Sequence, residues 1–431
     1  MHASQPTPNS KFYYGWTIVA GSAAIGFSAA AIAGLNFGFF ILPMGEELGI
    51  SQAFIGWAFT ARMIAFAASG FVIGKALDRH GPRMPLMVAG TVAGLAMVGF
   101  SQIHNGWHLI ALFIVIGSTG IQGAGANLYG SVPVAKWFSR KRGRAMALAF
   151  LGVPAGIFVF PALTPFLIDR IGWQSTWVVL GAIGGTSLFL IGLMVMRRQP
   201  QDYGLLPDGD LRSESPSPHS TGNPIEDLGS EISWTRAEAL RSRTFWRLAL
   251  LFGVMQFSTS TVGLFRVPYF IERGIDPQLV GFSFQGEAIF SVIAGIPVGF
   301  ALDRYQARYI GGATLIPRVL AILVTMMASS AWHALAAASL NGLAAASFVV
   351  VQNAIWPSYF GSRHIGSIRG ASMAITLTFA ALGAPLTGTV HDMTGSYLPV
   401  WWVSVALVTL AALMILRTPK PTHPSKVPSG A

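Results

Sequence analysis

The sequence predicts an all-α membrane protein in which twelve transmembrane helices form two six-helix bundles. First, 52% of the 431 residues are hydrophobic and only 10% are charged, whereas soluble domains carry about 25% charged residues. Second, apolar stretches of about 20 residues, the length that crosses about 30 Å of hydrocarbon, recur along the whole chain. Third, one long polar segment divides these stretches six and six.

The predicted spans are the apolar stretches between short polar loops. They cover residues 16–40, 53–76, 84–103, 107–134, 144–168, 173–197, 243–271, 279–302, 309–329, 331–358, 368–391 and 397–416. Residues 198–242 are rich in Pro, Ser, Gly and charge, which is typical of a solvated, largely disordered linker. We therefore expect an amino-terminal bundle at 1–197, a cytoplasmic linker at 198–242 and a carboxyl-terminal bundle at 243–431.

Composition and motifs argue against several classes of protein. The net charge of +11 does not indicate nucleic-acid binding, because the basic residues lie in short loops between apolar stretches. The chain has no Cys, no histidine spacing typical of a metal site, and no nucleotide-binding Gly-x-x-x-x-Gly-Lys loop. We expect no metal, no cofactor, no ATP-driven step and no enzyme activity. The polar start, Met1–Ser10, lacks the features of a secretory signal, so the first span is expected to be retained.

The distribution of Lys and Arg predicts the orientation in the membrane, because cytoplasmic loops carry an excess of these residues. With both termini in the cytoplasm, Arg170 and Arg273 fall outside. Arg62 and Arg266 fall within spans, and all other Lys and Arg are assigned to the cytoplasmic side. The expected location is a bacterial inner membrane, crossed many times.

The two halves of the chain repeat a short motif. Residues 74–79 read Gly-x-x-x-Asp-Arg after the second span, and residues 299–304 repeat the pattern after the eighth. An Arg-Gly pair at 142–143 and another at 369–370 enter the fifth and eleventh spans at a nearly equal offset. These repeats indicate a duplicated six-helix unit, with a central site expected near mid-membrane.

The first copy of the motif opens a tight turn. Gly74 has no side chain to keep a neighbouring helix away, and Asp78 can accept hydrogen bonds from backbone donors at a helix N-terminus. Arg79 and Arg83 can pair with acidic groups or lipid phosphates, and Gly81 permits a left-handed residue. The alternative is a charged loop that only sets orientation.

Together with the six-plus-six plan, these motifs resemble the major facilitator superfamily over nearly the whole chain. The resemblance implies a loop that latches the two halves during a conformational switch. Its residues would be Gly74, Asp78, Arg79, Gly81, Arg83, Asp303 and Arg304.

A second motif narrows the resemblance. Residues 137–143 read Trp-Phe-Ser-Arg-Lys-Arg-Gly and run into Gly-Val-Pro-Ala-Gly at 152–156, which resembles the signature of monocarboxylate transporters. Residues 197–209 resemble the start of the linker in the bacterial relatives of that family. That family usually has an Arg late in its eighth span, and some relatives have a Lys in the first. Residues 291–299 contain no Arg and residues 16–40 no Lys, so the resemblance implies the fold but not the usual substrate ligands.

Ionisable residues inside the bilayer are costly and indicate function. Arg62, Arg266 and Glu287 lie about 13, 8 and 12 Å in from the outer ends of their spans, at about 1.5 Å per residue. Either arginine offers a fixed positive fork for a carboxylate, and a desolvated Glu287 can carry a coupling proton. Alternatively, Arg266 and Glu287 only neutralise each other, or Arg266 reaches the outer headgroups.

Polar side chains in other spans are candidates to complete the binding site, although each is also a candidate for a bond between helices. The resemblance favours the fourth span, which commonly lines the cavity in similar transporters. The candidates are Asn36, Asn127, Tyr129, Gln256, Asn353 and Tyr359.

The sequence thus predicts a monomeric secondary transporter of a small organic anion, a mono- or dicarboxylate, driven by protons through alternating access. Two alternatives remain open. One is efflux of a hydrophobic or neutral compound, and the other is a receptor that binds a solute without moving it.

Overall fold

A computed structural model describes residues 13–32, 34–121, 128–203, 205–209, 234–361 and 364–421, and the regular elements within them are all helices. The first half contains α1 (Gly15–Ala31), α2 (Gly34–Phe37), the 3-10 helix η1 (Gly38–Phe40), α3 (Ile41–Leu48), α4 (Gln52–His80), α5 (Arg83–Phe100), α6 (Gly106–Ser118), α7 (Leu128–Trp137), α8 (Arg142–Phe150) and α9 (Gly152–Met194). Two 3-10 helices, η2 (Pro200–Tyr203) and η3 (Pro207–Gly209), follow, and then α10 (Arg236–Arg241). The second half contains α11 (Arg243–Glu272), α12 (Pro277–Arg304), α13 (Ala307–Ala313), α14 (Ile316–Met326), α15 (Ala331–Phe360), α16 (Ile365–Thr394) and α17 (Leu398–Leu416).

These helices confirm the predicted fold class and fit twelve crossings. Within the described residues, nine helices are long and apolar enough to span a membrane. One of the nine, Arg142–Met194, covers both the fifth and sixth predicted spans, which are divided at Gly172, where φ is +78°. The first and fourth predicted spans are each built from shorter helices.

The broken first and fourth spans differ from the continuous helices that the sequence predicted. α1 ends at Ala31, and the first span then continues through α2, η1 and α3 as far as Leu48. α6 ends at Ser118, and Gly120 has a φ of +69°, a left-handed conformation that ends a helix. Each break frees carbonyl groups that need hydrogen-bond donors from elsewhere.

Glycines set the closest helix contacts within each half. Between α5 and α9, a Cβ added to Gly185 would lie 2.7 Å from Cα of Gly94. Between α12 and α15, a Cβ added to Gly342 would lie 2.1 Å from the carbonyl oxygen of Glu287. Small residues permit such backbone approaches between membrane helices, and the second approach holds the backbone of Glu287 in place.

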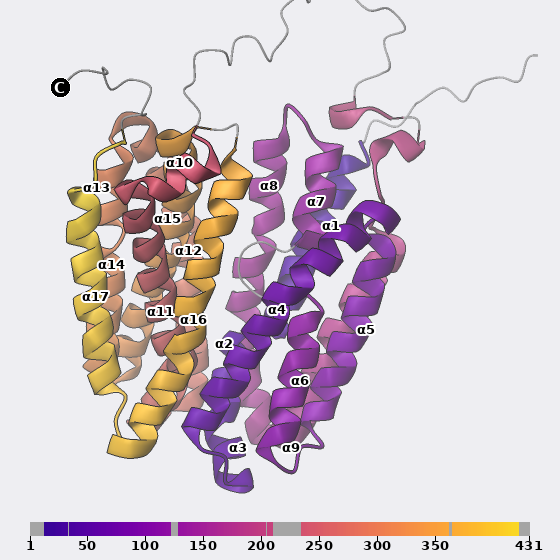
Figure 1. Ribbon diagram of the computed structural model, residues 1–431. Helices are drawn as coiled ribbons and strands as arrows, with labels where there is room; N and C mark the ends of the chain where they lie inside the picture. The colour runs from indigo at the N-terminus through magenta and orange to yellow at the C-terminus, as the bar shows by residue number, and fades with distance from the viewer. Residues whose placement is uncertain are drawn as a thin grey trace, which may run out of the picture.

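Helices α1–α9 gather on one side of the molecule and α10–α17 on the other (Figure 1). We call the end that carries η2, η3 and α10 the linker end, and the opposite end the far end. At the far end, the backbone N–H groups of Gln52 and Ala53 on α4 donate to the carboxylate of Asp392 on α16 at 3.1 and 2.8 Å. Nearby, Thr60 donates to the carbonyl of Ala381 at 2.5 Å.

Toward the linker end, glycines of α4, α12 and α16 have open space beside them. A Cβ added there would meet nothing within 4 Å at Gly70 and Gly74 of α4, Gly295 and Gly299 of α12, and Gly366 and Gly370 of α16. At the far end, a Cβ on Gly388 of α16 would lie 2.3 Å from the carbonyl oxygen of Gln52. The two halves are in backbone contact at the far end, and we infer that they are open at the linker end.

The predicted linker is described only at its two ends, since residues 204 and 210–233 lie outside the described residues. Its first part is attached to the amino half: the carboxylate of Asp208 accepts hydrogen bonds from the backbone N–H groups of residues 139–141 at 2.7 to 3.1 Å. Burial raises the pKa of Asp208, but these bonds and the charge of Arg140 outweigh it and hold that pKa below its usual value. The last part of the linker is attached to the carboxyl half, where the backbone N–H of Trp234 donates to the backbone carbonyl of Phe360 at 3.1 Å.

Candidate functional site

A polar stripe along α11 leads from the linker end toward Arg266. Gln256 and Gly263 are half-buried and Thr259 is exposed, in a helix that is otherwise largely buried. Their spacing of three to four residues places them on one face with Arg266. A Cβ on Gly263 would meet nothing within 4 Å, so open space lies one turn from Arg266. Because the exposed positions are polar, we infer that this face meets water rather than lipid.

Arg266 belongs to a chain of polar contacts that joins four helices and returns to its own helix. Its guanidinium pairs with Glu287 on α12, and Glu287 also accepts from the side-chain amide of Asn341 on α15 at 2.9 Å. The Asn341 oxygen accepts from Arg318 on α14. Nε of Arg318 donates to Ser258 at 3.0 Å, which returns the chain of contacts to α11. We call these five residues the polar ring.

An aromatic contact links the polar ring to the amino half. The Arg266 guanidinium lies over the ring of Phe284, 4.3 Å from its centroid. Phe284 in turn contacts Phe39 of η1, with 6.0 Å between ring centroids. Arg266 therefore lies directly behind a contact between the two halves.

Arg318 was predicted to lie on the cytoplasmic side, and this prediction was wrong. This residue lies in α14, within the predicted span 309–329, and is 3% exposed. An arginine inside an apolar stretch could have been recognised from the sequence as a candidate functional residue. Asn341 gave no comparable signal, because a single amide in a long apolar helix usually makes only a bond between helices.

In the amino half, Arg62 lies at the break in the first span. Its Nη2 donates to the carbonyl of Ile32 at 3.3 Å, and the Asn36 amide donates to the carbonyls of Ala30 and Ala31, both at 3.2 Å. These donors occupy carbonyls that the end of α1 leaves free. Within the described part of the chain, no carboxylate pairs with Arg62.

The break in the fourth span lies beside another candidate. The hydroxyl of Tyr129 donates to the carbonyl of Thr119 at 2.8 Å, which bridges α7 and the end of α6. Asn127 lies outside the described residues. Broken helices with free backbone groups are typical of binding sites in transporters, so the two breaks mark the amino-half wall of the candidate site.

The buried charges of the described spans are unbalanced. Arg62, Arg266 and Arg318 are 5%, 3% and 3% exposed, and the buried carboxylate among the described spans is that of Glu287, 6% exposed. Two positive charges thus remain without a buried counter-charge. Uncompensated charge is costly in a medium of low dielectric, and an anion would reduce that cost.

Two further candidates lie away from the polar ring. Along α15, Asn353 and Tyr359 are about 18 and 27 Å from Asn341, at 1.5 Å per residue. Asn353 is exposed and accepts from Arg369 at 3.1 Å. Tyr359 is buried near the linker end and donates to the carbonyl of Thr418 at 3.2 Å.

The predicted switch loop is solvent-facing at the linker end. Gly81 has a φ of +72°, as its expected role in a turn requires. Asp78 forms an ion pair with Lys136 at 3.7 Å, where the sequence suggested backbone donors. Gly74 makes no close helix contact in this open arrangement. The remaining members are exposed: Arg79, Arg83, Asp303 and Arg304.

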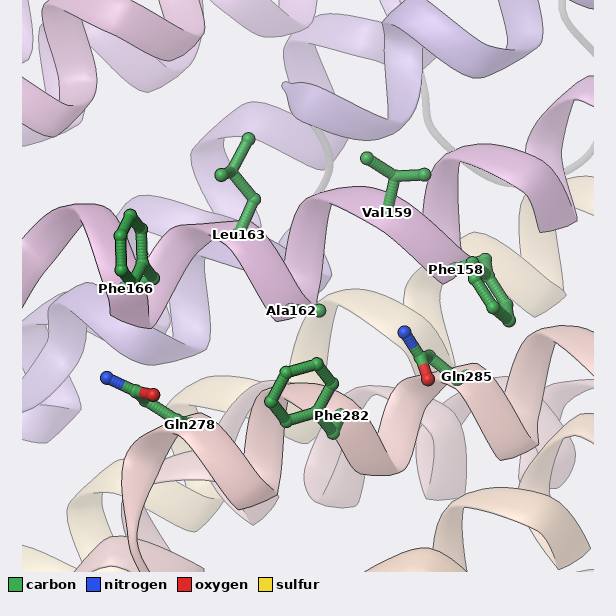
Figure 2. Close-up of a pocket in the computed structure, with 8 residues that line it drawn as sticks. All are labelled: Phe158, Val159, Ala162, Leu163, Phe166, Gln278, Phe282 and Gln285. Carbon is green, nitrogen blue, oxygen red and sulfur yellow. The ribbon is translucent and has the colours of Figure 1, made fainter.

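A groove runs between α9 of the amino half and α12 of the carboxyl half (Figure 2). Its volume is about 350 Å³, and its lining is mostly apolar. Phe158, Ala162 and Phe166 on α9 line one side of the groove, and Phe282, flanked by Gln278 and Gln285, lines the other side on α12. Within the described residues, no group of three or more His, Cys, Asp or Glu side chains is suited to hold a metal ion.

Comparison with known proteins agrees with this architecture. Residues 22–284 and 248–431 match the Major Facilitator Superfamily. The chain therefore belongs to the major facilitator superfamily, and it is a membrane transporter of small molecules rather than an enzyme.

Its relatives at low identity include carriers of organic acids by name. Human Monocarboxylate transporter 6 is 25% identical over 395 residues, which cover 88% of this chain and 75% of that protein. The Probable L-galactonate transporter of Escherichia coli (strain K12) is 22% identical over 401 residues, 88% of this chain and 84% of that one.

Solved structures share the fold. A bacterial homologue of the human lysosomal transporter Spinster, in an inward-facing and unoccupied conformation, has a TM-score of 0.69 at 15% identity, covering 96% of this chain and 100% of that one. The nucleoside transporter NupG also has a TM-score of 0.69, at 12% identity, covering 93% and 99%.

Proposed function

We propose that this chain is a secondary active transporter of a small organic anion, a mono- or dicarboxylate, and that transport is coupled to protons. The observation that carries the proposal is the excess of buried positive charge: three buried arginines against one buried glutamate in the described spans. The names of the relatives, which include monocarboxylate and galactonate transporters, support the same class of substrate.

The substrate enters at the linker end and follows the polar stripe of α11 to Arg266. There its carboxylate competes with Glu287 for the guanidinium, whose fork suits bidentate binding. Arg62, with Asn36 and Tyr129 near the two helix breaks, forms the opposite wall. Asn127, a further proposed ligand, lies outside the described residues. Gln256 lines the path from the linker end.

Glu287 is the proposed carrier of the coupling proton. In the polar ring its carboxylate pairs with Arg266 and accepts a hydrogen bond from the side-chain amide of Asn341. Once a substrate carboxylate binds Arg266, Glu287 loses its ion-pair partner, and in this proposal a proton takes that partner's place. Substrate and proton would thus load together.

Movement of the two bundles, residues 1–197 and 243–431, then exposes the site to alternate sides, with residues 198–242 as the linker. The far-end contacts of Gln52 and Ala53 with Asp392 separate, and the linker end closes. In the closed state the switch loop at 74–83 and its copy at 303–304 latch the halves together.

We also propose that the protein acts as a monomer in a bacterial inner membrane, with both termini and the linker end in the cytoplasm. The excess of Lys and Arg at the linker end supports this orientation. The open arrangement described above is then the inward-facing one.

Uptake of labelled mono- and dicarboxylates into proteoliposomes, with and without a pH gradient, tests the function. We expect uptake that an inward proton gradient increases and that Arg266→Gln abolishes. Glu287→Gln should permit substrate exchange while removing the effect of the gradient. Uptake that ignores both the gradient and the arginine would contradict the proposal.

The apolar groove of Figure 2 favours a second candidate, efflux of a hydrophobic compound that enters from the membrane. Phe282→Gln would then reduce efflux of an apolar dye from cells, whereas Arg266→Gln would not. If the substrate is instead an organic anion, Arg266→Gln should reduce carboxylate uptake and Phe282→Gln should not.

A further inference from the structure

The polar ring carries one more positive charge than negative charge. It contains the guanidinium groups of Arg266 and Arg318 and the single carboxylate of Glu287. All three side chains are more than nine-tenths buried. Asn341 and Ser258, the other members, are neutral, so no member of the ring compensates the second arginine.

The ring also contains donors without acceptors. Nε of Arg266 and Nη2 of Arg318 are buried and have no hydrogen-bond partner within the described residues. Burying an N–H group without an acceptor is costly, more so when the group is charged. An anion bound at the ring would supply an acceptor that these donors lack and would neutralise the excess charge.

The backbone around the ring favours a small anion. A Cβ on Gly342 would lie 2.1 Å from the carbonyl oxygen of Glu287, and one on Gly286 would lie 2.4 Å from the hydroxyl of Ser339. α12 and α15 are therefore in backbone contact beside the ring. A halide is compact and accepts N–H groups from any direction, whereas an organic acid needs room for its carbon skeleton.

We propose that the polar ring is a binding site for one small inorganic monoanion, and that its occupant is a halide such as chloride. The anion neutralises the ring and holds Arg266 and Arg318 together when no substrate is present. This site does not depend on which solute crosses the membrane, because the excess charge belongs to the ring itself.

Thermal unfolding of the purified full chain in detergent, followed by tryptophan fluorescence, tests the site. Chloride is compared with bromide and with the bulkier methanesulfonate at equal ionic strength. We expect chloride and bromide, but not methanesulfonate, to raise the Tm saturably, on the order of 3 °C at a hundredfold excess over Kd.

Variants distinguish the polar ring from other arginines. Arg318→Gln leaves a neutral ring and should remove the halide response, whereas Glu287→Gln adds to the excess charge and should enlarge it. Arg62→Gln, a buried arginine outside the ring, should keep the wild-type response. If a ring variant does not fold, the comparison of chloride with methanesulfonate in the wild type decides.

Two results would overturn the proposal. They are equal melting in chloride and methanesulfonate, and a halide response that survives Arg318→Gln. Carboxylate uptake by the wild type is measured separately, so loss of the halide site leaves the proposed function to its own test.

Discussion

The two halves of the chain hold their buried arginines in different ways. In the amino half, Arg62 donates to a backbone carbonyl beside a broken helix. In the carboxyl half, Arg266 and Arg318 are held by side chains in a ring built from four helices. The repeated fold therefore does not repeat its site. The amino half offers a single cation bonded to a backbone carbonyl at a helix break, and the carboxyl half offers a network of side chains with surplus positive charge.

The largest effect is expected at Arg266. Arg266→Gln removes one member of a buried ion pair and leaves Glu287 without its nearest cation, so carboxylate uptake should fall by at least on the order of 100-fold. Proteoliposome uptake measures the change. Arg273→Gln is the matched control, because Arg273 is an exposed arginine at the end of the same helix. Equal loss in both variants would mean that charge near the far end matters, not the ring.

A smaller loss is expected at Arg62, where one hydrogen bond and one charge are removed. Arg62→Gln should lower uptake on the order of 10-fold, and Arg62→Lys should restore much of it, because a lysine can keep the charge and donate to Ile32. Arg266→Lys should not recover, since an ammonium lacks the planar fork. If lysine rescues both positions or neither, the contrast between the halves fails.

Contact between the halves at the far end gives the next prediction. The chain has no Cys, so Thr259→Cys provides a unique label on the polar stripe. Gly388→Leu introduces a side chain where a Cβ would lie 2.3 Å from Gln52. It should shift the population toward the state closed at the linker end and slow thiol labelling from that side, roughly 10-fold for an overpacking cost of about 1–3 kcal/mol.

Gly366→Leu is the control for this labelling, because a Cβ at Gly366 would meet nothing within 4 Å. The double variant Thr259→Cys with Gly366→Leu should be labelled at the same rate as Thr259→Cys alone. Equal slowing in both double variants would contradict the closed far end and open linker end.

The smallest effect concerns the linker. Asp208→Asn weakens the bonds to the N–H groups of residues 139–141 and should destabilise the protein by about 1 kcal/mol. Because the pKa of Asp208 is lowered in the folded chain, its contribution is present above the unfolded pKa of about 3.9 and is lost as pH falls through the lower folded pKa. Thermal unfolding should therefore separate the two proteins at neutral pH and bring them together in acid. A constant difference would show that the charge of Asp208 is irrelevant.

Much of the fold could be predicted from the sequence, because apolar length and charge placement are direct consequences of the bilayer. The succession of apolar spans was predicted in this way. The turn at Gly81 was predicted from the freedom of glycine to adopt a positive φ. The breaks after Ala31 and Ser118 were not, since glycines occur throughout these apolar stretches and do not reveal which of them ends a helix.

The candidate site was predicted only in part. Arg62, Arg266 and Glu287 could be found one by one as charges inside apolar spans, and the pairing of Arg266 with Glu287 was one of the alternatives. The polar ring could not be found, because Asn341 and Ser258 join it through contacts between distant segments. Arg318 was visible in its span but was counted with the cytoplasmic charges.

The central claim is that surplus buried positive charge selects an anionic substrate, and matched acid and amide pairs test it most directly. Lactate and lactamide, or succinate and succinamide, have similar shapes but differ in charge. We expect proteoliposomes that contain the wild-type protein to take up at least one of the acids and to exclude its amide. Arg266→Gln should remove this preference for the acid. Equal uptake of an acid and its amide would contradict the central claim.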